Sequence, residues 1–128
     1  MTKYQKPAGF TRSLALAWRG LMYSWKTQGH LQFHAIAAIL VLGAAWWVRL
    51  SRWEWVLVIY AIGSVITAEV MNTAIELVVD LAQPKFHPLA GMAKDVAAGA
   101  VLVTALQSVV IGIFLFGPPL WRWLEQIW

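Results

Sequence analysis

Residues 53–82 read WEWVLVIYAIGSVITAEVMNTAIELVVDLA, a long and mostly apolar stretch that is typical of a membrane-spanning helix. Its second half places Glu69, Asn72, Glu76 and Asp80 in an otherwise apolar sequence. At about 100° per residue, these four side chains fall on one stripe of a single helix. Acidic groups are costly in a membrane-bound helix, so a stripe of them predicts a functional site.

The composition of the whole chain is typical of an integral membrane protein. Of its 128 residues, 60% are hydrophobic and only 12% are charged, and nine are Trp. The length suits one domain, and the absence of Cys excludes disulfides and thiolate metal sites. The net charge is +4. Without a basic, aromatic-rich soluble patch, we expect these charges to meet anionic lipid headgroups and not nucleic acid.

We therefore expect an all-α integral membrane protein with a single domain over residues 1–128. Apolar residues recur at helical spacing over about 9–28, which predicts an amphipathic helix on the membrane surface, with a soluble bundle helix as the alternative. Three spans are expected, at about 31–48, 53–82 and 92–116. The last should end at Gly117-Pro118-Pro119, because proline and glycine interrupt helices.

The basic residues indicate how these spans are oriented. Seven lie at the N-terminus and in the 83–95 loop, and three lie at the other ends of the spans: Lys3, Lys6, Arg12, Arg19, Lys26, Lys85 and Lys94, against Arg49, Arg52 and Arg122. The excess of positive charge predicts a cytoplasmic N-terminus. Glu69 then lies about 24 Å along the helix from Trp53, near the cytoplasmic edge of a hydrocarbon core about 30 Å thick.

A second polar cluster follows the acidic helix, as Phe86-His87-Pro88-Leu89-Ala90-Gly91-Met92-Ala93-Lys94-Asp95. Lys94 can bind phosphate as a point charge, and Asp95 can hold Mg²⁺ or orient Lys94. The backbone N–H of Gly91 can face a phosphate near the start of the third span. Singly, these residues could be ordinary interfacial charges. Together with the acidic stripe they form the usual parts of a phosphoryl-transfer site.

The two clusters resemble motifs of the prokaryotic diacylglycerol kinase family, which includes the undecaprenol kinases. The family pattern E-x-hydrophobic-N-[S/T]-A-I-E-x-x-V-D is found at 69–80, and H-x-L-x-x-x-A-K-D at 87–95. The resemblance extends from Gly9-Phe10-Thr11-Arg12 through the third span. It implies a homotrimer in the bacterial cytoplasmic membrane, with shared active sites facing the cytoplasm. It also implies transfer of the γ-phosphate of ATP, with Mg²⁺, to the hydroxyl of a membrane lipid.

The resemblance further implies roles for individual residues. Glu69 resembles the general base, and Asn72 resembles its orienting partner. Glu76 resembles a Mg²⁺ ligand. The implied ATP-binding residues are Arg12, Gln28, Glu76, His87, Lys94 and Asp95. The implied lipid-binding residues are Arg12, Glu69 and Ala98, with Asp80 and Gly91 in the same site.

The chain departs from the family at Gln28, where a Glu usually shares Mg²⁺ with the carboxylate at 76. A Gln offers a carbonyl oxygen without charge, so metal affinity could fall, or Asp80 or Asp95 could compensate. The nearby His30 and His34 are expected to be structural and not metal ligands.

The acceptor and the activity have alternatives. The acceptor is indicated by segments that resemble the undecaprenol kinase branch more than the diacylglycerol branch: Gln32-Phe33-His34, Asn72-Thr73 and the run that begins at Asp95. This resemblance favours undecaprenol over diacylglycerol. Because of Gln28, the alternative is that the chain is a degenerate, non-catalytic member of the family that binds lipid or nucleotide. An ion-conducting oligomer could use the carboxylates as a cation ring, but it would leave Lys94 and Asp95 unexplained.

Overall fold

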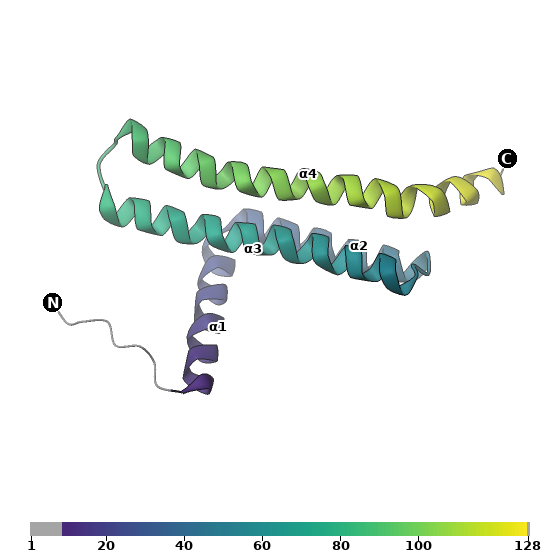
Figure 1. The fold of residues 1–128 in the computed structure, drawn as a ribbon, viewed down its shortest axis with the longest axis horizontal. Helices are drawn as coiled ribbons and strands as arrows, with labels where there is room; N and C mark the ends of the chain where they lie inside the picture. The colour runs from purple at the N-terminus through teal and green to yellow at the C-terminus, as the bar shows by residue number, and fades with distance from the viewer. Residues whose placement is uncertain (1–8, 128) are drawn as a thin grey trace.

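Three long helices lie side by side and a shorter one projects steeply from the start of one of them, as Figure 1 shows for the computed structural model. The structure describes residues 9–127. In chain order the helices are α1 (Phe10–Thr27), α2 (Gly29–Trp47), α3 (Arg52–Ala82) and α4 (Pro88–Glu125). Each of α2, α3 and α4 is long and apolar enough to cross a membrane. The all-helical architecture with three long apolar helices is therefore confirmed.

The helix α3 is the centre of the arrangement. It contacts each of the other three helices and is the most buried of the three candidate spans. A small apolar core lies toward its N-terminal end, where Ala45, Val58 and Leu115 pack together. Large apolar side chains elsewhere on α2 and α4, such as Ile39 and Phe114, are exposed. Such an outer surface suits contact with lipid or with other subunits.

The connection from α2 to α3 is fixed by local hydrogen bonds. Arg49 adopts the left-handed conformation (φ 57°) just after α2. Its N–H bonds to the Trp46 carbonyl at 3.2 Å, and the Leu50 N–H bonds to the Ala45 carbonyl at 3.1 Å. Ser51 then starts α3 with a capping box, in which its hydroxyl accepts from the Glu54 N–H and the Glu54 carboxylate accepts from the Ser51 N–H.

The helix α4 is longer than the sequence predicted. It begins at Pro88, a position that suits proline because the first N–H groups of a helix have no partner. The expected end at Gly117-Pro118-Pro119 is wrong, because α4 continues to Glu125. Proline removes N–H donors but keeps a helical φ, so the chain can continue in a helix. The last turns change direction in this region, as expected for proline within a helix (Figure 1).

Candidate active site

The predicted polar stripe lies on α3 and runs from the interior to the surface. Glu69 and Asn72 are buried, with 4% and 9% of their surface exposed. Glu76 is half-buried, and Asp80, near the end of the helix, is exposed. The stripe therefore has a buried carboxylate, Glu69, at one end and a solvent-exposed one, Asp80, at the other.

Glu76 is held by two side-chain amides. The Nδ2 of Asn72, one turn earlier on α3, donates to Glu76 Oε1 at 3.1 Å. The Nε2 of Gln28 donates to Glu76 Oε2 at 3.2 Å. The structure thus brings the predicted metal-site pair, Gln28 and Glu76, into contact. The contact of Asn72 is with Glu76, whereas the family resemblance implied that Asn72 orients Glu69.

Gln28 reaches Glu76 because it forms the corner between α1 and α2. It is the one residue between the two helices, and its backbone is extended (φ −114°, ψ 103°). Its N–H bonds back to the Ser24 carbonyl at 2.9 Å. Across the corner, Gln32 Nε2 donates to the Trp25 carbonyl at 2.8 Å. These bonds close the corner and direct residue 28 toward α3.

Glu69 contacts a histidine of α2 that was expected to be only structural. His34 Nε2 lies 3.3 Å from Glu69 Oε1. The next turn of α3 is tied to the same residue, because Thr73 Oγ1 donates to the Glu69 carbonyl at 2.9 Å. Sequence spacing along one helix cannot reveal a pairing between two helices, so this contact was missed.

The second predicted cluster meets the stripe at its exposed end. Lys94 Nζ pairs with Asp80 Oδ1 at 2.5 Å, so α3 supplies the partner of Lys94. The sequence had suggested Asp95 for this task, and Asp95 is exposed. Because the side chains of Lys94 and Asp80 are 36% and 63% exposed, water screens their attraction. Both charges are therefore available to a soluble ligand.

Two residues at the start of α4 have local structural contacts. His87 is the N-cap of the helix, and its Nδ1 accepts from the Leu89 N–H at 3.2 Å. The N–H of Gly91 donates to the His87 carbonyl at 3.1 Å. The expectation that this N–H faces a phosphate is therefore wrong, because the helix already uses it. The space beside Gly91 is open, with no atom within 4 Å of where a Cβ would lie.

The remaining predicted residues lie on the surface. Arg12 is exposed in the first turns of α1, and Ala98 is exposed on α4. Within residues 9–127 the contacts between basic and acidic side chains are the His34–Glu69 contact and the Lys94–Asp80 ion pair. Arg12 therefore makes no ion pair with the carboxylates of α3 in its own chain.

The donor set around Glu76 suits a hard cation such as Mg²⁺. Carboxylate and amide oxygens are its usual protein ligands, and it keeps several waters or phosphate oxygens as further ligands. Asn72 Oδ1 is buried without a hydrogen-bond partner, so the site has an oxygen acceptor to spare. Within the described part of the chain, no three His, Asp or Glu side chains come together as a metal site. A cation here would therefore depend on ligands from a nucleotide or water.

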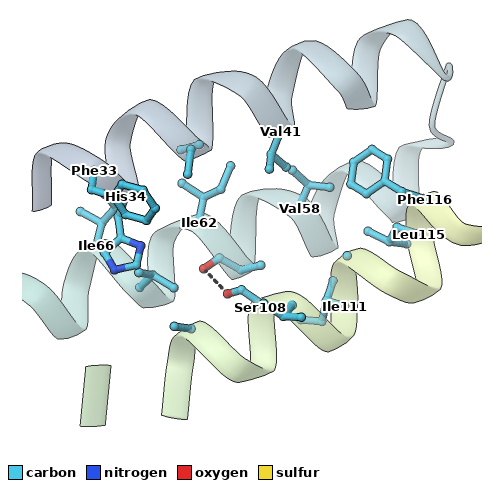
Figure 2. A pocket seen from close by; sticks show the side chains of 17 residues that line it. Phe33, His34, Val41, Val58, Ile62, Ile66, Ser108, Ile111, Leu115 and Phe116 are labelled. Carbon is cyan, nitrogen blue, oxygen red and sulfur yellow. Dashed lines mark hydrogen bonds between the residues drawn. The ribbon is translucent and has the colours of Figure 1, made fainter. Parts of the chain in front are cut away.

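An apolar cleft of about 480 Å³ lies between α2, α3 and α4 (Figure 2). His34 lines it toward one end and Phe116 toward the other. Its walls are almost entirely aliphatic and aromatic, and inside it Ser108 Oγ donates to the Ala61 carbonyl at 3.2 Å. The cleft can hold an apolar chain, and its His34 end adjoins the Glu69 carboxylate.

Comparison with known proteins decides the family. The sequence model of the prokaryotic diacylglycerol kinases matches residues 15–116, which include every site residue above except Arg12. The chain belongs to this family. An undecaprenol kinase of Bacillus subtilis is 46% identical over 111 residues, covering 87% of this chain and 90% of that protein. A diacylglycerol kinase of Escherichia coli K12 is 33% identical over 105 residues, covering 80% and 86%.

A third relative is matched over a smaller share of its own length. A diacylglycerol kinase of Synechocystis is 38% identical over 109 residues, covering 84% of this chain and 62% of that protein. Membership of the family makes the chain a lipid kinase, which is a phosphotransferase with an alcohol acceptor. Together with the three apolar helices it also makes the chain a multi-pass membrane protein.

Proposed function

We propose that the protein transfers the γ-phosphate of MgATP to the hydroxyl of a membrane lipid, with undecaprenol favoured over diacylglycerol. One observation carries this proposal: a buried carboxylate, Glu69, adjoins an apolar cleft and lies two turns from Glu76, whose oxygens are held by amides. Seven residue steps separate the two carboxylates along the chain, which corresponds to about 10.5 Å of helix. That separation leaves room for a lipid hydroxyl at one and a metal-bound phosphate at the other.

Glu69 acts as the general base in this mechanism. A lipid alcohol is a poor nucleophile, and a carboxylate within hydrogen-bond reach can remove its proton during attack. The hydroxyl oxygen forms the new bond to the γ-phosphorus as the bond to the ADP oxygen breaks, and the proton moves to Glu69. The burial of Glu69 keeps competing water away from the reacting atoms.

The side chains that would bind the metal are those of Glu76, Gln28 and Asn72. A bound Mg²⁺ would neutralise charge on the phosphates. Asn72 keeps the Glu76 carboxylate in place and has a spare Oδ1 for the cation or for a water on it. Lys94, partly exposed beside Asp80, supplies a positive charge for the nucleotide phosphates.

The other predicted residues fit a trimer with shared sites. Arg12 is exposed and makes no ion pair with the α3 carboxylates of its own chain, as expected if it serves a neighbouring subunit together with Asp95 and Ala98. The exposed Phe10, Leu14 and Trp18 suit α1 to a membrane surface. The excess of basic residues near the N-terminus supports a site that faces the cytoplasm.

The decisive experiment offers undecaprenol and diacylglycerol separately, in micelles, to purified protein with γ-labelled ATP and Mg²⁺. Label in one lipid, lost in the variant Glu69→Gln, would support the proposal and identify the acceptor. Label in neither lipid across a Mg²⁺ range would refute it and favour a non-catalytic member. The second outcome would have a physical reason in Gln28, because its neutral amide binds a metal less strongly than a carboxylate does.

A further inference from the structure

The geometry points to His34 as a positioning residue, whose imidazole ring lies against the Glu69 carboxylate and holds it in the orientation needed to take a proton from the lipid hydroxyl. This inference rests on the proposed function, in which Glu69 is the base. Its starting point is the 3.3 Å contact between His34 Nε2 and Glu69 Oε1. The two side chains come from different helices, so the contact fixes α2 against α3 at the level of the base.

Glu69 depends on this contact for its orientation. Only 6% of its side chain is exposed, and a buried carboxylate without a hydrogen-bond donor is strongly destabilised. Among residues 9–127, His34 is the one side chain within hydrogen-bond or ion-pair distance of this carboxylate. Since a Glu side chain has three rotatable bonds, a single polar neighbour has a large influence on where its oxygens point.

The second carboxylate oxygen stays available for the reaction. Within the described residues, the one buried side-chain oxygen or nitrogen without a partner is Asn72 Oδ1. Glu69 Oε2 also lacks a protein donor, so it is not completely enclosed. The contact at Oε1 therefore leaves Oε2 free to accept a proton.

His34 lies at the end of the apolar cleft that is nearest to Glu69. The ring projects from α2 toward Ile66, which lies one turn before Glu69 on α3 (Figure 2). Phe33 meets the ring edge-to-face, with centroids 5.5 Å apart and planes at 73°. The imidazole is thus fixed by an aromatic neighbour and lies between the apolar cleft and the base. A lipid chain lying in the cleft would present its hydroxyl at this point.

The test compares His34→Leu, which removes the polar contact with Glu69, with His34→Gln, which keeps a polar N–H group of similar reach. We expect His34→Leu to lower kcat by up to about 100-fold, the effect of a misplaced reacting group. The KM for MgATP should change less than about twofold, because the Gln28–Glu76 contact is separate. His34→Gln should keep most of kcat. His30→Leu, exposed one turn earlier on α2, is the matched control and should leave both constants unchanged.

Size in micelles and thermal unfolding would first verify that the variants are folded. If His34→Leu fails to fold, His34→Asn takes its place, because its shorter amide does not reach Glu69 and should lose the same activity. Wild-type kcat in His34→Leu or His34→Asn, or equal losses in His34→Gln and His34→Leu, would overturn the inference while leaving the kinase intact. An inactive wild-type protein would instead refute the proposed function.

Discussion

The Nε2 atom of Gln28 donates to Glu76 Oε2 at 3.2 Å, from the corner between α1 and α2 to the middle of the polar stripe on α3. A neutral amide thus lies where the family resemblance implies a second carboxylate. The hydrogen bond satisfies Glu76 in the absence of metal. It also means that a cation at this point would meet one negative side chain and not two.

Replacing Gln28 by Glu should strengthen the dependence on Mg²⁺. Two adjacent carboxylates repel each other until a cation binds, so Gln28→Glu should lower the Mg²⁺ concentration for half-maximal activity by about tenfold, the scale on which ligand-shell changes act. The measurement is a Mg²⁺ titration of lipid phosphorylation. Gln83→Glu, which adds the same charge at the exposed end of α3, is the control. An unchanged titration would show that residue 28 does not face the metal.

Replacing the proposed base, Glu69, should strongly reduce turnover while leaving the binding of MgATP intact. Glu69→Gln keeps the shape of the side chain but cannot take the proton, so kcat should fall by about 10²–10⁴-fold. Binding of MgATP, followed by equilibrium titration of the purified variant, should stay close to wild type because Glu76 and Lys94 are intact. Normal phosphorylation by this variant would exclude Glu69 as the base.

The charge of Lys94 should contribute more to ATP binding than to the stability of the folded protein. Its pair with Asp80 is largely exposed, so Lys94→Met should lower the free energy of unfolding by less than about 1 kcal/mol. The KM for ATP should rise by about tenfold, as expected for loss of a phosphate-binding charge. Arg122→Met removes an equal charge in the last turn of α4 and serves as the control. Equal KM values for Lys94→Met and wild type would remove Lys94 from the nucleotide site.

The capping box at Ser51 offers a test of the fold that is separate from the chemistry. Ser51→Ala removes the hydroxyl that accepts from the Glu54 N–H and should destabilise the protein by about 1 kcal/mol. Ser51→Thr keeps the hydroxyl and should lose little. Thermal unfolding in micelles checks both variants. A melting temperature for Ser51→Ala equal to that of wild type would show that the cap contributes nothing.

Much of the fold could be predicted because helical periodicity and apolar length are local properties. The common helix of Glu69, Asn72, Glu76 and Asp80 is a consequence of their spacing alone. The α4 helix was predicted too short, because glycine and proline were treated as stops. The His87-Pro88 pair is a recognisable start signal, an N-cap followed by proline, and it could have placed the true beginning of α4.

The candidate site was predictable only in part. The contact between Gln28 and Glu76 was anticipated through the family motif, since 48 residues separate them and spacing says nothing about their proximity. The contact of Asp80 with Lys94 and that of His34 with Glu69 depend on how neighbouring helices are rotated about their axes. That rotation is set by packing between helices, which a pattern along one helix does not contain.

The corner at Gln28 has a mechanical consequence. Because the linker is a single residue, a rigid-body rotation of α1 relative to α2 must occur chiefly through the φ and ψ angles of Gln28. The amide that touches Glu76 is attached to that same pivot. The hinge of α1 and one wall of the candidate metal site are therefore a single residue, and neither can be adjusted without moving the other.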